Sequence, residues 1–178
     1  MDVAFKRTGP RRYAVRVTVT GKPPQVMDPA PGFDEHIPHD LVHYLVEAEL
    51  KLKRGVFGRA ADGGGTFIAR DQDGHSARDR ARQRRKQRRR EEALETADAG
   101  SNEMLRSERL AAICDVLWRR RHGQRPDPGR KPPELLAPEE AQRAERVVAR
   151  LDEVARRWRE LPVGGELVFS WPSVEPRK

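Results

Sequence analysis

The sequence has little of the chemistry that stabilises secreted or membrane proteins. It holds a single cysteine, Cys114, among 178 residues, so it can form no internal disulfide and no cysteine-rich zinc site. No run approaches the 18 consecutive apolar residues of a membrane-spanning helix, and the first residues lack the apolar core of a signal peptide. These absences predict a cytoplasmic protein that has no membrane partner.

Charge, by contrast, is abundant and unevenly placed. Charged residues make up 36% of the chain, and the formal net charge is +8. The segment from Arg78 to Arg90 alone contains nine basic residues and one acid, Asp79, which is also a net charge of +8. The rest of the chain therefore balances 27 basic against 27 acidic residues, and any argument from charge to a partner concerns this one segment. The excess of arginine over lysine, with abundant alanine, glycine and aspartate, is typical of a GC-rich bacterial genome.

The pattern of apolar residues predicts an α+β fold. Alternation over residues 2–6 and 12–20 indicates a β-hairpin, and helical periodicity indicates a central helix and a C-terminal helical pair that can pack antiparallel. Glycines after Gly55 predict a loop from Val56 to Gly65. The elements expected are a small antiparallel sheet from residues 2–27, 66–69 and 166–171, helices at 38–53, 102–121 and 138–161, and a projecting basic helix at 76–99.

These elements divide the chain into three parts. The first part, 1–75, contains the sheet and the central helix, and the second, 76–100, is the basic arm. The third, 101–178, contains the helical pair and the closing strand, and it belongs with the first part in one domain.

The central helix carries the residues with the most suggestive chemistry. His39, His43 and Glu47 are four positions apart, so their side chains leave the helix on one side. Two imidazoles at this spacing can bind one divalent metal such as zinc. Glu47 is either a third ligand or a residue that orients His43 from behind. Further candidate ligands are Asp34, Glu35, His36 and His75; the competing interpretation is that the histidines only make hydrogen bonds inside the core.

The run His39-Asp40-Leu41-Val42-His43 resembles the His-Glu-x-x-His helix of zincin metallopeptidases. The resemblance implies that His39 and His43 bind zinc and that Asp40 is the base that activates a metal-bound water. Asp40 departs from the pattern, because aspartate is one methylene shorter than glutamate and reaches less far. A third histidine six residues on is missing, so the match supports a metal site more than proteolysis. The stretch 31–67 also resembles an uncharacterised bacterial family of unknown function, which implies no activity.

The basic arm predicts non-specific association with nucleic acid or another polyanion. Its nine side chains can each contact a phosphate, and arginine does so through two parallel hydrogen bonds. No aromatic residue lies between positions 70 and 100, so no platform for base stacking accompanies the charge. The competing interpretation is a solvated helix paired with its own acidic residues. The predicted contact residues are Arg78, Arg80, Arg82, Arg84, Arg85, Lys86, Arg88, Arg89 and Arg90.

Three functions from different classes follow, and the sequence leaves open whether the protein is an enzyme. The first is a non-catalytic protein that associates with a polyanion through residues 78–90. The second is a metal-binding protein or metal-dependent hydrolase that uses His39, His43 and Glu47. The third is a protein–protein adaptor, with a homodimer or another partner docked through helices 102–121 and 138–161.

Overall fold

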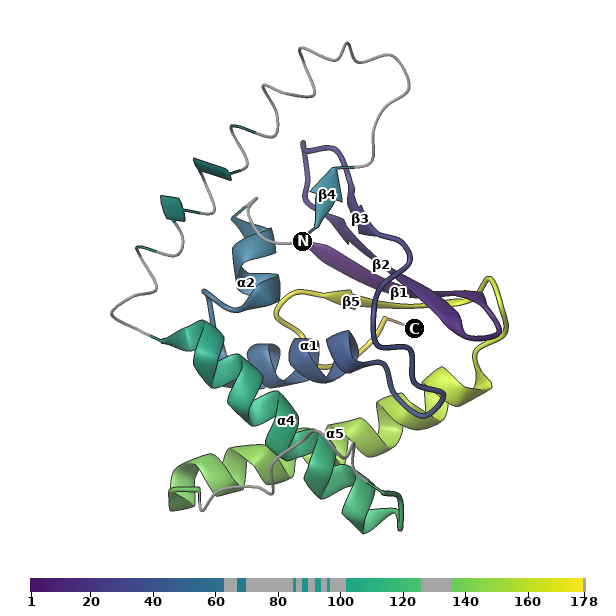
Figure 1. Cartoon of the computed structure of the whole chain (residues 1–178), viewed down its shortest axis with the longest axis vertical. Coiled ribbons are helices and arrows are strands. Elements are labelled where there is room, and N and C mark those ends of the chain that lie inside the picture. Colours follow the sequence, from purple (N-terminus) through teal and green to yellow (C-terminus); the bar gives the residue numbers. More distant parts are fainter. Residues whose placement is uncertain are drawn as a thin grey trace.

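The computed structural model describes most of the chain and confirms the α+β class (Figure 1). The described residues are 1–62, 67–69, 102–125 and 136–177, together with Arg85, Arg88, Arg89, Glu92, Ala93 and Thr96. In this part of the chain, no helix is both long enough and apolar enough to cross a membrane. Most of the basic arm, and the division of the chain at residues 75 and 100, lie outside the described residues.

A five-stranded antiparallel sheet forms one layer of the structure, with the strand order β4-β3-β2-β1-β5. The strands are β1 (Asp2–Gly9), β2 (Arg12–Thr18), β3 (Gln25–Met27), β4 (Ile68–Ala69) and β5 (Glu166–Ser170). The predicted hairpin is β1–β2, and the predicted C-terminal strand pairs with β1, far away in sequence. Phe5 lies opposite Val15 on β2 and Leu167 on β5, so one face of the sheet is apolar and buried.

The helices lie on the apolar side of the sheet. They are α1 (His39–Leu50), α2 (Val56–Ala61), α4 (Glu103–Arg121) and α5 (Pro138–Glu160). In Figure 1, α1 lies between the sheet and the crossed pair of α4 and α5. It contacts α2, α4 and α5, and the eight consecutive residues 41–48 are buried. Because α1 is covered all round, its polar side chains at His43 and Glu47 are carried into the interior, where they need partners.

Two predictions about the region after α1 are wrong. The helix expected to reach Lys53 ends at Leu50, because Lys51 takes a left-handed conformation with φ 56° and ends the helix four residues before Gly55. The loop expected from Val56 onward begins instead with the short helix α2. This helix is too short to show a helical period, but Phe57 and Ala60 pack into the core.

The predicted C-terminal helices are confirmed, but they do not pack antiparallel. Arg109 near the start of α4 bonds Glu140 near the start of α5, and Trp118 farther along bonds Asp152 farther along. The two helices therefore cross while running in the same general direction, which the long connection between them permits (Figure 1). Their apolar stripes are buried within the chain, so docking of a partner through them stays a prediction.

Candidate metal centre

Three metal-ligating side chains converge where α1 passes α4. The Nε2 atoms of His39 and His43 are 3.1 Å apart, and the two rings meet edge to face. The Oε2 atom of Glu108 on α4 is 3.5 Å from Nε2 of His43. The ligand atoms of all three residues lie within 4.8 Å of one another, which makes this group able to hold a metal ion. The predicted pairing of the two histidines is thus present, and a residue from another helix joins it.

The three side chains differ in how far they are buried. His43 is 3% exposed, His39 is partly buried, and the Glu108 side chain is 57% exposed. The group therefore has a buried inner end at His43 and an outer end at Glu108 that reaches solvent. An ion bound there would be held from inside by imidazole and would remain open to water on the outer side.

Glu47 does not join this group. Its Oε1 atom accepts hydrogen bonds from the Ser107 hydroxyl at 2.7 Å and the Val56 N–H at 2.8 Å, and its Oε2 atom accepts from the Phe57 N–H at 2.9 Å. Burial raises the pKa of the Glu47 carboxyl, while these three donors oppose the rise. Ser107 in turn contacts Nδ1 of His43 at 3.1 Å. Of the two roles predicted for Glu47, the geometry fits the residue behind His43 better than the third ligand.

Asp40, the predicted base, faces Tyr13 on β2. Its Oδ2 atom is 2.6 Å from the Tyr13 hydroxyl, which is also 2.7 Å from the carbonyl oxygen of Pro31. Burial raises the pKa of Asp40; the Tyr13 hydrogen bond opposes the rise, as does His43 in its charged form, and the charge of Glu108 adds to it. Asp40 is therefore close enough to interact electrostatically with two members of the candidate centre, His43 and Glu108, but its carboxylate is held by the Tyr13 hydroxyl.

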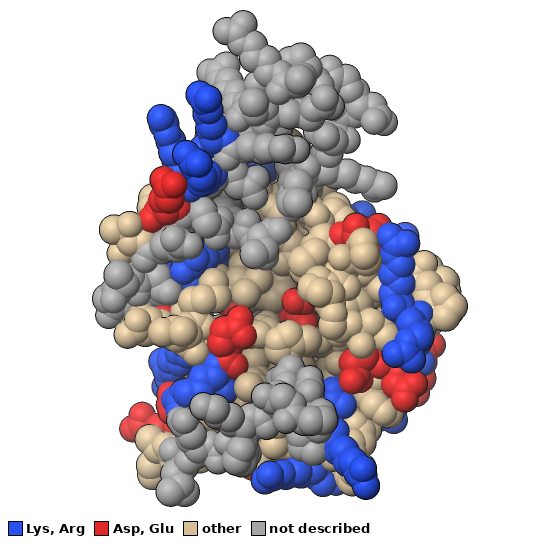
Figure 2. Space-filling model, viewed as in Figure 1, with Lys and Arg blue, Asp and Glu red and all other residues tan. Residues whose placement is uncertain are grey.

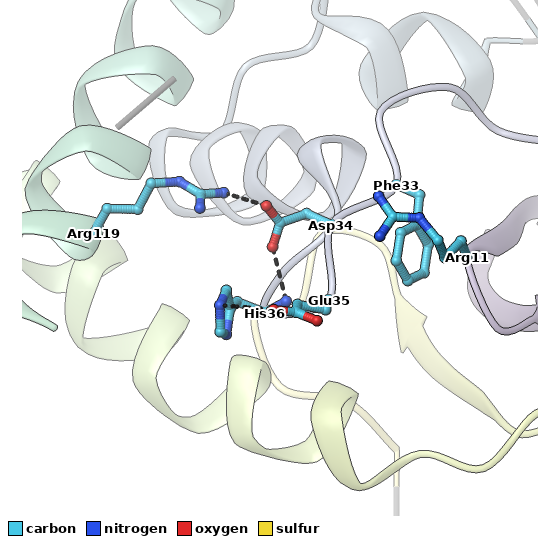
Figure 3. Close-up of a pocket in the computed structure, with 6 residues that line it drawn as sticks. All are labelled: Arg11, Phe33, Asp34, Glu35, His36 and Arg119. Atoms are coloured by element: carbon cyan, nitrogen blue, oxygen red, sulfur yellow. Dashed lines mark hydrogen bonds and ion pairs between the residues drawn. The ribbon is translucent and has the colours of Figure 1, made fainter. Parts of the chain in front are cut away.

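The other candidate ligands before α1 form a separate hollow, of about 310 Å³ (Figure 3). Asp34 accepts hydrogen bonds from the backbone N–H groups of His36 and Ile37 and from the guanidinium of Arg119, at 2.8 Å, 3.1 Å and 2.8 Å. Burial alone would raise the pKa of Asp34, but these donors together lower it. His36 lies 3.5 Å from Glu35. Asp34 therefore pairs with Arg119 and Glu35 lies beside His36, and among the described residues none of these joins the histidine group.

Only part of the predicted polyanion-binding set can be placed. Arg85, Arg88 and Arg89 have exposed side chains, and Arg88 forms an ion pair with Glu92 at 3.4 Å. The remaining members of the set lie outside the described residues: Arg78, Arg80, Arg82, Arg84, Lys86 and Arg90. The candidate ligand His75 also lies outside them.

Sequence reasoning missed Glu108 and Ser107. Both lie on α4, more than 60 positions from the histidines, and no local spacing rule links two helices so far apart. One signal was present for Ser107: it stands three positions before Leu110 and seven before Cys114, on the buried stripe of its helix. A small polar residue on such a stripe indicates a buried hydrogen-bond partner. Glu108, half exposed beside the stripe, gave no comparable signal.

Comparison with known proteins adds no family to this picture. No protein-family model matches the chain, and no curated protein and no solved structure is significantly similar to it. The function therefore has to be inferred from the side chains described above.

Proposed function

We propose that this protein binds one divalent transition-metal ion through His39, His43 and Glu108. The observation that carries the proposal is the convergence of their three ligand atoms within 4.8 Å, from two helices. Two ligand atoms at about 2.1 Å from a zinc ion, at the tetrahedral angle, lie about 3.4 Å apart. The distances from Nε2 of His43, 3.1 Å to His39 and 3.5 Å to Glu108, bracket that value.

The donor set selects the class of metal. Two imidazole nitrogens and one carboxylate suit zinc and the neighbouring transition metals, whereas calcium and magnesium prefer all-oxygen sites. Three protein ligands leave at least one coordination position for water, and the exposed Glu108 lies on the side open to solvent. The site thus has the composition of an open metal centre rather than of a closed structural one.

A more specific proposal than metal binding alone is that the site catalyses hydrolysis by a metal-bound water, with Asp40 as the base. Asp40 is close enough to the centre to interact with His43 and Glu108, which favours it, but its hydrogen bond to Tyr13 has to be released or shared. A panel of ester, peptide and phosphoester substrates tests it. Zinc-dependent turnover that is lost in Asp40→Asn but kept in Tyr13→Phe supports this role, and turnover that survives Asp40→Asn contradicts it.

Zinc titration of the chelator-treated, untagged chain by calorimetry tests the metal proposal. One ion per chain is expected, with the affinity lowered more than about 100-fold in His39→Ala/His43→Ala, beyond the usual cost of losing an outer partner. The matched control is His36→Ala/His122→Ala, which removes two histidines outside the group. Equal zinc binding by the two double variants would contradict the proposal.

A second candidate, polyanion association through residues 78–90, is favoured by the distribution of charge. The described arginines of the arm, Arg85, Arg88 and Arg89, are exposed. On the face shown in Figure 2, the coloured basic side chains lie among acidic ones and form no single patch, in keeping with the balance of charge outside the arm. Replacing the nine basic residues of the arm with glutamine should abolish retention on heparin and remove the steep salt dependence of binding. Retention that survives this change would contradict the second candidate.

A further inference from the structure

A buried chain of hydrogen bonds stands directly behind the candidate metal ligand His43. It runs from Nδ1 of His43 to the Ser107 hydroxyl at 3.1 Å, and from there to Oε1 of Glu47 at 2.7 Å. His43 is 3% exposed, and Ser107 and Glu47 are fully buried. Such a chain can be assigned hydrogen by hydrogen, because water does not compete for its members.

The assignment begins at Glu47. One of its oxygens accepts from the Val56 N–H and the other from the Phe57 N–H, at 2.8 Å and 2.9 Å. A backbone N–H only donates, so both oxygens already act as acceptors, and Oε1 also lies 2.7 Å from the Ser107 hydroxyl, for which it is an acceptor too. The remaining partner, Ser107, therefore donates its single hydroxyl hydrogen to Glu47.

The position of that hydrogen fixes the tautomer of His43. With its hydrogen directed to Glu47, the Ser107 oxygen is left as an acceptor toward His43, so Nδ1 of the ring must carry the proton. When the ring is neutral, its lone pair is therefore on Nε2, the atom that faces His39 and Glu108. This is the form in which an imidazole binds a metal.

We propose that Ser107 and Glu47 are positioning residues that hold His43 with Nδ1 protonated and Nε2 directed at the metal. The inference rests on the proposed function, because it assigns these residues a role only if His43 is a ligand. Ser107 is not available as a nucleophile, since it is fully buried and its hydrogen is directed to a carboxylate.

The surroundings of Glu47 support a fixed position for the chain. Its partners come from α4 and from the start of α2, while Glu47 and His43 belong to α1, so three helices hold the ring. Gly55 lies against the carboxylate, and a Cβ atom there would come within 2.3–2.6 Å of its three heavy atoms. Glycine at this position leaves the room that the carboxylate needs.

Long-range ¹H–¹⁵N NMR spectra of the chelator-treated full chain test the tautomer without any substitution. The expected result is His43 with a protonated Nδ1 and a bare Nε2. The opposite tautomer, with the proton on Nε2, would overturn the proposal. Because the wild-type protein is used, failure of a variant to fold does not affect this measurement.

Zinc affinity tests the positioning role. Ser107→Ala should lower the affinity about 10–100-fold, the usual cost of losing an outer partner, and should leave a mixture of His43 tautomers. Ser107→Thr, which keeps the hydroxyl, should restore both properties. Circular dichroism confirms that each variant is folded, and a folded Ser107→Ala that binds zinc as tightly as the wild type would overturn the role.

The failure of this inference and the failure of the proposed function give different results. A wild-type chain that takes up no zinc overturns the metal site itself. A wild-type chain that binds zinc, but whose His43 carries its proton on Nε2 beforehand, leaves the site in place and overturns the positioning role.

Discussion

Two polar clusters lie beside the start of α1, and they differ in what stands at their centre. In one cluster, the Arg119 guanidinium lies between two carboxylates, 2.8 Å from Asp34 and 3.0 Å from Asp115. In the other, two imidazole nitrogens and the Glu108 carboxylate face one another. Both are built from α4 and from the chain at or just before the start of α1. In the Arg119 cluster, the guanidinium is itself the cation that neutralises the carboxylates, so the cluster stabilises the fold. In the histidine group, the nitrogen and oxygen atoms that face one another are of the kinds that bind a metal ion.

The largest loss of stability in either cluster is expected when the Glu47 carboxylate, which lies behind the histidines, is removed. Glu47→Ala should lower the free energy of unfolding by roughly 4 kcal/mol, because each buried donor left without an acceptor costs about 1–3 kcal/mol. Three donors are affected: the Val56 and Phe57 N–H groups and the Ser107 hydroxyl. Urea unfolding measures the loss, and Glu49→Ala on the same helix is the control. A loss as small as that of the control would show that the buried carboxylate contributes little.

The second largest effect is expected in the ion-pair cluster. Arg119→Ala should cost about 3 kcal/mol, the lower end for breaking a buried pair, because it leaves Asp115 and Asp34 without their cation. Zinc affinity should not change, since Arg119 does not contact the histidine centre. Urea unfolding and calorimetry check the two statements, with the exposed neighbour Arg120→Ala as the control. A parallel loss of zinc affinity would contradict the separation of the two clusters.

Acid should weaken two sets of carboxylate–arginine ion pairs by a smaller amount: Asp34 with Arg119 in the ion-pair cluster, and Glu140 of α5 with Arg106 and Arg109 of α4. The pKa of Asp34 lies below its ordinary value of 3.8, and hydrogen bonds and charge from Arg109 and Arg106 hold the pKa of Glu140 below 4.5. A carboxyl with a depressed pKa in the folded state stabilises the fold above its ordinary value and loses that contribution as the pH falls through the folded value. When the free energy of unfolding is measured from pH 6 to pH 2, Asp34 and Glu140 should therefore lower it below about pH 4.5, while Asp40 and Glu47, whose pKa values are raised, act in the opposite direction. The fall should be shallower in Glu140→Gln, and an unchanged slope would contradict the assignment.

The smallest effect on stability is expected at Glu108, the proposed metal ligand on α4, although its replacement should change zinc affinity. Glu108→Gln replaces a side chain that is 57% exposed, so the free energy of unfolding should change by no more than about 0.5 kcal/mol. Zinc affinity should nevertheless fall at least about tenfold, because a charged ligand is lost. Glu139→Gln on α5 is the matched control, and equal zinc affinity in the two variants would remove Glu108 from the site.

The sequence predicted the parts of the fold that have a local period. Alternation placed the β1–β2 hairpin, and the 3.6-residue stripes placed α1, α4 and α5. The short helix α2 and the early end of α1 at Lys51 were missed, because six residues show no period and a left-handed lysine follows no composition rule.

The candidate site divides in the same way. The spacing of His39 and His43 on one helix was readable, and the helix does bring their Nε2 atoms together. The contribution of Glu108 could not be predicted from the sequence, because its place beside His43 depends on how α4 crosses α1. Glu47 was identified as a residue that could act behind His43. The hydrogen bonds that link it to His43 pass through Ser107, another residue of α4, which the spacing along α1 does not reveal.

The most direct test of the central claim is the metal content of the untagged chain as purified, measured by elemental analysis. The account predicts close to one zinc or similar transition-metal ion per chain in the wild type and in His36→Ala/His122→Ala, and almost none in folded His39→Ala/His43→Ala. Metal in all three proteins, or in none of them even after incubation with zinc, would contradict a metal centre at His39, His43 and Glu108.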